Sequence, residues 1–283
     1  MKSLSQRLKQ DEILIAPGVF DMISAKVADS LGFDVLYMTG YGVVASHLGL
    51  PDAGIATYTD MVGRVRQIAE GTKTPLIADG DTGYGGLLNL EHTVRGYERA
   101  GATAIQLEDQ EFPKKCGHML GRNVVPLEDM LAKIRVARDT RDSKEFLIIA
   151  RTDSRTTLGL DEALRRADAF AEAGADVLFV ESPESEEEMR TICERFDLPL
   201  LANMVEGGRT PVLSRDELQS LGYKIALFPG SGFLAAGQAL KAVYTDLKET
   251  GSTAGSKVDF YPFAEFSQLM GFGQVYDFEQ KYK

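Results

Sequence analysis

The chain has 283 residues, 44% of them hydrophobic and 26% charged, and it carries a formal net charge of −11 at pH 7. This balance is typical of a globular protein with a large core. An acidic surface repels phosphate backbones, so we expect no nucleic-acid partner. No apolar run approaches the roughly 20 residues that a membrane helix needs, so we expect no membrane partner either.

The cellular compartment is predicted from the N-terminal segment and the cysteines. The first residues are polar and contain no apolar signal-peptide core. The two cysteines, Cys116 and Cys193, lie in very different sequence contexts, and free thiols are typical of a reducing compartment. We therefore expect a cytoplasmic protein without a structural disulfide.

Eight short runs rich in strand-forming residues recur along the chain. Most are continuously apolar rather than alternating, which is typical of parallel strands buried on both faces. The runs cover residues 13–16, 35–39, 75–79, 104–108, 146–151, 177–181, 198–203 and 225–228.

Helical patterns lie between these runs, at residues 21–31, 90–100, 126–137 and 160–173. Several end at a glycine, which supplies the left-handed cap that terminates a helix. The alternation predicts an α/β protein with a (β/α)8 barrel of the TIM type over residues 1–250. An open doubly wound sheet is the alternative, although no G-x-G-x-x-G motif opens a helix after the first strand.

The segment after the predicted barrel, residues 251–283, differs in composition because it is rich in aromatic residues. Aromatic surface outside a closed barrel usually packs against something else. We expect this helical tail to pack on a neighbouring subunit.

Acidic residues follow two neighbouring predicted strands. Asp79 and Asp81 come at the end of the third strand, and Glu108 ends the fourth. In a barrel the chemistry lies at the carboxyl ends of the strands. Carboxylates gathered there repel one another unless a cation or proton lies among them, and magnesium prefers such oxygen ligands. Asp-Gly-Asp is also ordinary turn chemistry, but Glu108 at the next strand end favours a metal site.

The loop after the fourth strand reads K-K-C-G-H at residues 114–118. A thiol flanked by Lys and His is a candidate thiolate or a candidate acid. Gly117 and Gly121 would let such a loop move as a lid over a substrate. The chain has no C-x-x-C or H-E-x-x-H motif, which disfavours a zinc site. The close spacing of Cys116 and His118 disfavours a protease-type pair, and an incidental cysteine in a surface loop is the remaining alternative.

Two segments together resemble the isocitrate lyase and phosphoenolpyruvate mutase superfamily. Residues 114–118 are similar to its K-[KR]-C-G-H signature, and residues 79–85 are similar to its D-x-D-x-G-[FY]-G segment. The resemblance runs from Pro17 to about Gly251. It implies a (β/α)8 barrel whose last helix is swapped between two subunits, in a homotetramer built as a dimer of helix-swapped dimers.

The resemblance also implies a cofactor. It places magnesium, with manganese as an alternative ion, at Asp79 and Asp81. Glu108 would hold the water ligands of the metal, and Asp52 would support the metal shell.

The implied partner is a small anionic 2-hydroxy acid. Backbone and side-chain donors for one substrate carboxylate would come from Thr39, Gly40 and Tyr41, and Arg151 would bind a carboxylate too. The far wall of the pocket is implied to contain Asn203 and Glu181, the latter counted among the catalytic residues, and Pro229 is a candidate substrate contact.

The implied reaction is cleavage of a 2-hydroxy dicarboxylate or tricarboxylate into a 2-oxo acid and a second carboxylic acid. Tyr37, or a base linked to the metal, would take the hydroxyl proton. Cationic donors for the carbanion are Arg151, Lys114 and His118. Cys116 would then protonate the carbanion as a general acid.

Within the superfamily, several reactions stay open. Mutases and phosphonopyruvate hydrolases usually lack Cys-Gly-His in this loop, so Cys116 favours a lyase over phosphoryl chemistry. Oxaloacetate hydrolases carry Ser where we align Pro229, and proline has no hydrogen-bond donor. Methylisocitrate-cleaving members read K-R-C-G-H and N-I-T-E-F-G, whereas this chain has Lys115 and N-M-V-E-G-G at 203–208. Those departures are more similar to members that cleave 2,3-dimethylmalate.

Two readings of other classes remain. A barrel that binds a dicarboxylate without turnover is compatible with the fold, but such a protein has no need of a thiol acid on a mobile loop. A Schiff-base aldolase needs a buried lysine of lowered pKa, and no predicted strand contains a lysine.

Overall fold

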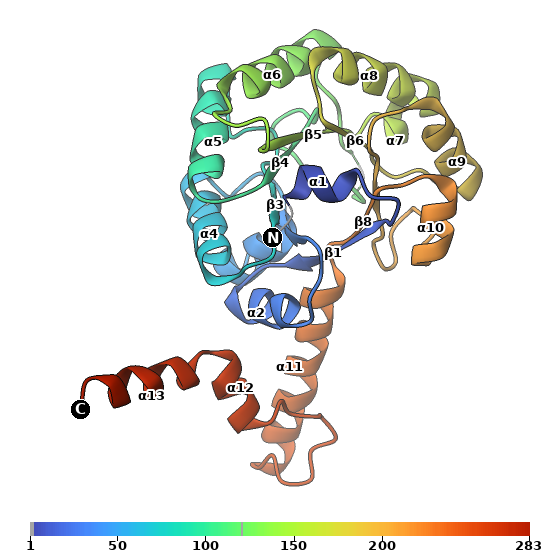
Figure 1. Ribbon diagram of the computed structural model, residues 1–283. Helices are drawn as coiled ribbons and strands as arrows, with labels where there is room; N and C mark the ends of the chain where they lie inside the picture. The colour runs from blue at the N-terminus through green and yellow to red at the C-terminus, as the bar shows by residue number, and fades with distance from the viewer. Residues whose placement is uncertain (1–2, 120) are drawn as a thin grey trace.

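The computed structural model of the protein describes residues 3–119 and 121–283. Its eight strands are β1 (Leu14–Val19), β2 (Leu36–Met38), β3 (Leu76–Asp79), β4 (Ala104–Glu108), β5 (Leu147–Thr152), β6 (Val177–Val180), β7 (Leu201–Asn203) and β8 (Ile225–Phe228). They form one parallel sheet in the order β6-β5-β4-β3-β2-β1-β8-β7. A parallel bridge between Leu178 and Leu200 joins the two ends of this order. The sheet is therefore a nearly closed barrel, which confirms the predicted fold class (Figure 1).

The predicted strands agree with the observed ones in number and position. Every residue of β2 to β7 is buried, as expected of strands covered on both faces. The limits differ by more than one residue at two places: β1 continues to Val19 instead of ending at residue 16, and β7 begins at Leu201 instead of residue 198.

Helices surround the barrel as an outer ring (Figure 1). The ring consists of α2 (Met22–Ser30), α4 (Tyr58–Gly71), α5 (Leu87–Arg99), α6 (Leu127–Thr140), α8 (Leu160–Ala173), α9 (Glu186–Arg195) and α10 (Arg215–Leu221). Shorter helical segments follow β2 and β5 at the carboxyl ends of the strands. They are α3 (Gly40–Val43), the π-helix η1 (Val44–Leu48) and α7 (Arg155–Leu158).

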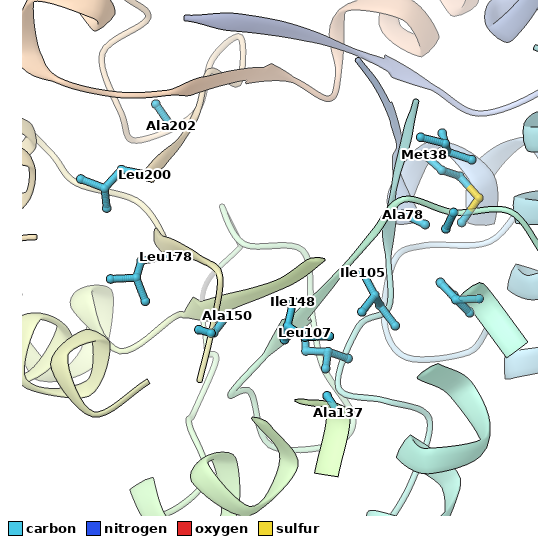
Figure 2. Close-up of a cluster of buried hydrophobic side chains, with 14 of the residues drawn as sticks. Met38, Ala78, Ile105, Leu107, Ala137, Ile148, Ala150, Leu178, Leu200 and Ala202 are labelled. Atoms are coloured by element: carbon cyan, nitrogen blue, oxygen red, sulfur yellow. The ribbon is translucent and has the colours of Figure 1, made fainter. Parts of the chain in front are cut away.

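The core has two layers. The larger one fills the space between strands and surrounding helices, and Figure 2 shows part of it, including Met38, Ile105 and Leu178. The smaller one fills the barrel itself, and it includes Leu4 and Leu8 of α1 (Leu4–Leu8) together with strand residues such as Leu14. Helix α1 therefore closes the amino-terminal end of the barrel, and the carboxyl-terminal end is left for a site.

The helix after β8 does not join the ring. Helix α11 (Ser231–Thr250) leads away from the barrel, and α12 (Phe263–Leu269) and α13 (Phe272–Lys281) lie beyond it (Figure 1). None of these three helices contains a buried residue in the single chain. The expected exchange of this helix between subunits stays a prediction. No helix in the described ranges combines the length and apolar character needed to cross a membrane.

Candidate active site

A cavity of about 300 Å³ opens at the carboxyl ends of the strands. Most of the predicted site residues line it: Tyr37, Thr39, Tyr41, Asp52, Asp79, Glu108, Lys114, Cys116, His118, Arg151, Asn203 and Pro229. The others, Gly40, Asp81 and Glu181, lie directly behind lining residues, which they contact through polar groups. The structure therefore brings all the predicted site residues together.

Lys114 lies between two of the predicted metal carboxylates. Its Nζ atom is 2.6 Å from Oδ1 of Asp52 and 2.6 Å from Oδ1 of Asp81, and all three side chains are buried. Burial alone would lower the pKa of Lys114, but the surrounding carboxylates, Asp81 and Glu108 foremost, hold that pKa well above its ordinary value. Lys114 is therefore a cation, and it is not a candidate for Schiff-base chemistry.

Asp79 is held by backbone donors on both oxygens. Its Oδ1 accepts a hydrogen bond from the Asp81 amide at 3.1 Å, and its Oδ2 accepts one from the Gly40 amide at 3.2 Å. Gly40 is required for this approach, because a Cβ atom there would lie 2.5 Å from Asp79 Oδ2. The backbone thus fixes the position of one carboxylate at the cavity wall.

The donor set suits a hard cation. Among the described residues, Oδ1 of Asp52, Oδ1 of Asp81 and Oε1 of Glu108 are buried without a hydrogen-bond partner, although Lys114 lies close to the first two. No three His, Cys, Asp or Glu side chains in the described ranges converge tightly enough to hold an ion by themselves. Magnesium retains several waters and takes few ligands from protein, so this arrangement fits an ion bound partly through water.

Arg151 lies at the centre of a buried cluster of charges. Its Nε and Nη2 atoms donate to the two carboxylate oxygens of Asp153, both at 2.9 Å. Nη2 also lies 3.2 Å from Oε2 of Glu181, and Nη1 lies 3.6 Å from Oε2 of Glu108. Burial would lower the pKa of Arg151, but these carboxylates raise it well above its ordinary value. The guanidinium is therefore a fixed positive charge at the cavity wall.

Tyr37 enters the cavity from β2 with its hydroxyl already engaged. The hydroxyl donates to Oε1 of Gln106 at 2.6 Å. Burial, assisted by the charge of Asp79, raises the pKa of Tyr37 well above its ordinary value. The phenol therefore keeps its proton, which weakens the expectation that Tyr37 is the base.

Cys116 lines the cavity and is partly buried. Its amide donates to the Asp52 carbonyl at 3.2 Å. Burial raises the pKa of the Cys116 thiol, although a hydrogen bond from the His118 amide opposes that effect. Of the two states that the sequence left open, thiolate and acid, these surroundings favour the protonated acid.

His118 is a neutral group in this environment, unlike the cation expected from the sequence. Burial lowers the pKa of His118, although Glu181 opposes that effect. Nδ1 accepts a hydrogen bond from the Arg209 amide at 3.2 Å, which leaves the proton on Nε2. Nε2 lies 3.5 Å from Oε1 of Glu181, and Glu181 also accepts a hydrogen bond from Asn203 at 3.0 Å.

Several functional candidates were absent from the predicted set. Gln106 interrupts an apolar strand run, which is a signal that sequence reasoning can use. Asp153 follows β5 directly, and a polar residue at a strand end is the signal that identified Asp79 and Glu108. Further side chains line the cavity: Val205 and Glu206 from the N-M-V-E-G-G segment, to which no site role was assigned beyond Asn203, and Phe233 and Leu234 from a segment without a motif.

The chain matches known proteins over nearly its whole length. The phosphoenolpyruvate phosphomutase family model matches residues 4–248. The 2,3-dimethylmalate lyase of Eubacterium barkeri is 50% identical over 99% of this chain and 96% of its own length. A 2-methylisocitrate lyase of Aeropyrum pernix is 40% identical, over 98% of this chain and 88% of its own length.

Solved structures agree with these matches. A crystal structure of a 2,3-dimethylmalate lyase, described as a PEP mutase/isocitrate lyase superfamily member, has a TM-score of 0.92 and 37% identity, and the match covers 100% of this chain and 96% of that one. An oxaloacetate acetylhydrolase in complex with 3,3-difluorooxalacetate has a TM-score of 0.93 and 35% identity, with coverages of 99% and 96%. A phosphonopyruvate hydrolase in complex with oxalate and Mg²⁺ has a TM-score of 0.88 and 28% identity, with coverages of 98% and 96%. The chain therefore belongs to the phosphoenolpyruvate phosphomutase family, within the PEP mutase/isocitrate lyase superfamily.

Proposed function

We propose that the protein is a magnesium-dependent carbon–carbon lyase that cleaves a small 2-hydroxy dicarboxylate of the 2,3-dimethylmalate type into pyruvate and a second carboxylic acid. The observation that carries this proposal is the placement of one thiol: Cys116 opens onto the same cavity as Arg151 and the carboxylate cluster. A protonated thiol and a fixed cation that line one cavity supply the proton donor and the charge stabilisation that a carbanion needs. The similarity to a dimethylmalate lyase supports the same substrate class.

Substrate binding follows from the charges and the shape of the wall. Arg151 binds a substrate carboxylate, because its charge faces the cavity while Asp153 holds its other edge. An apolar part of the wall, formed by Leu227, Pro229 and Phe233, suits methyl substituents. An additional methyl group in an apolar pocket contributes roughly 1–3 kcal/mol of discrimination.

The carboxylate cluster acts on the substrate hydroxyl. Asp79, Asp81 and Glu108 would hold magnesium, which when bound would lower the pKa of that hydroxyl. We assign the hydroxyl proton to a carboxylate of this cluster rather than to Tyr37, because the Tyr37 hydroxyl already donates to Gln106. The base linked to the metal, which the family resemblance implied as the alternative to Tyr37, is therefore preferred.

Cleavage breaks one O–H bond and one carbon–carbon bond of the substrate. The O–H bond breaks, the hydroxyl carbon becomes a carbonyl, and the electron pair of the carbon–carbon bond passes to the carbon next to the second carboxylate. Arg151 stabilises that negative charge, with the Lys114 cation nearby. The Sγ atom of Cys116 donates its proton to the carbanion, which leaves as a carboxylic acid anion.

A product assay tests the proposal. The purified protein is supplied with magnesium and, separately, with 2,3-dimethylmalate, 2-methylisocitrate, isocitrate, oxaloacetate and phosphonopyruvate. Pyruvate from 2,3-dimethylmalate supports the proposal, and pyruvate from 2-methylisocitrate alone moves the substrate to the tricarboxylate class. Turnover of oxaloacetate or phosphonopyruvate alone refutes the lyase. The Cys116→Ala variant is assayed in the same way. The Cys193→Ala variant, which changes the other thiol, serves as its control.

A further inference from the structure

Arg122 takes no part in the proposed reaction, yet its guanidinium is buried beside the site. Its side chain is 1% exposed and contacts Asp153 through Nη1. Nη2 donates to Oγ1 of Thr156 at 2.8 Å, and Nε donates to the Met119 carbonyl at 3.0 Å. Every edge of the guanidinium is therefore engaged within the protein, and Arg122 does not line the cavity.

The partners of Arg122 belong to two different parts of the site. Asp153 follows β5, and its Oδ1 accepts from both Arg122 and Arg151. Met119 lies on the segment of Cys116, and the Met119 amide donates to the Cys116 carbonyl at 2.9 Å. Arg122 thus connects the segment that carries the Cys116 thiol with Asp153. Asp153 in turn orients Arg151, the arginine that binds the substrate.

The charges give Arg122 a second effect. Arg151 lies beside three buried carboxylates, those of Asp153, Glu181 and Glu108. A buried carboxylate without its own cation is strongly unfavourable. Arg122 supplies a second cation at Asp153. Without Arg122, more of the positive charge on Arg151 would be neutralised by Asp153 and less would be available to a substrate.

We propose that Arg122 is a positioning residue that couples the Cys116 segment to Arg151, by holding the Met119 carbonyl and Asp153 at the same time. The kinetic part of this inference rests on the proposed lyase function. The coupling itself does not involve the substrate, so it can be tested without any measurement of turnover.

Thiol labelling measures directly whether Arg122 holds the Cys116 segment in place. The folded protein is treated with iodoacetamide, and mass spectrometry follows the alkylation of Cys116 and Cys193 separately. In the Arg122→Met variant we expect Cys116 to react several-fold faster, because its segment has lost an anchor, while Cys193 on α9 keeps the wild-type rate. The Arg141→Met variant is the matched control, because it removes another largely buried arginine, paired with Asp176, at the amino-terminal end of the barrel.

Steady-state kinetics measure how the loss of Arg122 affects the function of Arg151. On a substrate that the wild type cleaves, we expect Arg122→Met to lower kcat by up to about 100-fold, as expected of a small misplacement of a catalytic group. KM changes less, since the substrate keeps its other contacts. Arg122→Lys retains a cation at Asp153 but not all three contacts, so it recovers part of kcat and gives an intermediate labelling rate.

Four results would overturn the proposal. Unchanged labelling of Cys116 in Arg122→Met excludes the coupling, and equal acceleration at both cysteines indicates general loosening instead. Faster labelling with unchanged kcat excludes the effect on Arg151. Should Arg122→Met fail to fold, Arg122→Lys replaces it as the test. A Cys116 labelling rate and a kcat equal to those of the wild type in Arg122→Lys would then exclude the proposed role of Arg122. If the wild type cleaves none of the assay substrates, the lyase function fails, and labelling alone decides on Arg122.

Discussion

The chain at Gly117 passes directly over the guanidinium of Arg151. A Cβ atom at Gly117 would lie 2.2 Å from Nη2 of Arg151 and 2.9 Å from Oε2 of Glu181. The arginine is not free to move aside, because Asp153 holds it through two hydrogen bonds. The segment that carries the thiol therefore reaches its observed position only with glycine at residue 117.

The Gly117→Ala variant tests this relationship. The added methyl group forces the segment away from Arg151, so the thiol no longer reaches the carbanion, and we expect kcat/KM to fall by about 100-fold or more. The control is Gly63→Ala in α4, where a Cβ atom meets nothing within 4 Å. That change is expected to leave turnover unaltered and to raise the free energy of unfolding by roughly 0.5–1 kcal/mol. Wild-type turnover by Gly117→Ala would show that the close contact has no role in the reaction.

Removal of the thiol is expected to separate chemistry from binding. Cys116→Ala lacks the proton donor, and loss of a general acid typically costs roughly 10²–10⁴-fold in rate. KM should change little, because Arg151 and the carboxylate cluster remain. Steady-state kinetics beside Cys193→Ala give the comparison. Undiminished kcat in Cys116→Ala would remove Cys116 from the mechanism.

The pH dependence of the thiol follows from its surroundings. Burial raises the pKa of Cys116 above its ordinary value of 9.0. Because the acid works only while protonated, this requirement is met below that pKa and is lost as the pH rises through it. We therefore expect the step that needs Cys116 to persist to pH 9 and to decline only at higher pH.

Alkylation against pH measures the same group without a substrate. The Cys116 rate should rise with a midpoint above pH 9, and the Cys193 rate should rise later still, because burial raises the pKa of Cys193 to about 12. A midpoint for Cys116 near neutrality would identify a thiolate, and the acid role would have to be replaced by a nucleophilic one.

How far the site follows from sequence depends on the kind of contact. Asp79 and Glu108 were predicted because each ends a strand, and the barrel brings strand ends to one face, whereas the role of Arg151 was implied by the family resemblance. The roles of Arg122 and Gln106 depend on contacts between segments that the pattern of a single strand or loop does not contain. His118 was expected to be a cation because the sequence does not show how deeply a side chain is buried. Burial in the folded chain lowers the pKa of His118.

The fold shows a similar division. Continuously apolar runs made the strands predictable, since β2 to β7 are buried along their whole length. Helix α1 has five residues, too few for a periodic pattern, so its place within the barrel core was not foreseen. Only the family resemblance implied that the last helix leaves its own barrel. The apolar residues of α11 do not indicate whether they pack against their own chain or against another subunit.

Metal dependence is tested at Asp81, whose backbone adopts the left-handed conformation with φ +48°. Asparagine tolerates that conformation as well as aspartate does, so Asp81→Asn removes the charge and retains the backbone. We expect chelation to abolish turnover, magnesium to restore it with manganese as a substitute, and Asp81→Asn to need a higher magnesium concentration. The control is Asp139→Asn, an exposed carboxylate paired with Arg138. Full turnover in excess chelator would exclude the metal.

Finally, the exposed aromatic tail predicts an oligomer. Phe263 on α12 is 87% exposed and Phe278 on α13 is 65% exposed in the single chain, which is unfavourable for side chains of this size unless a partner covers them. We propose that a second subunit does so, within a homotetramer. Light scattering should then give four times the chain mass of 30.9 kDa. Replacing both residues by Asp should lower that mass, whereas Glu265→Lys on the same α12 should not. A wild-type protein with the mass of one chain would refute the subunit exchange, and the barrel site would then have to function in an isolated chain.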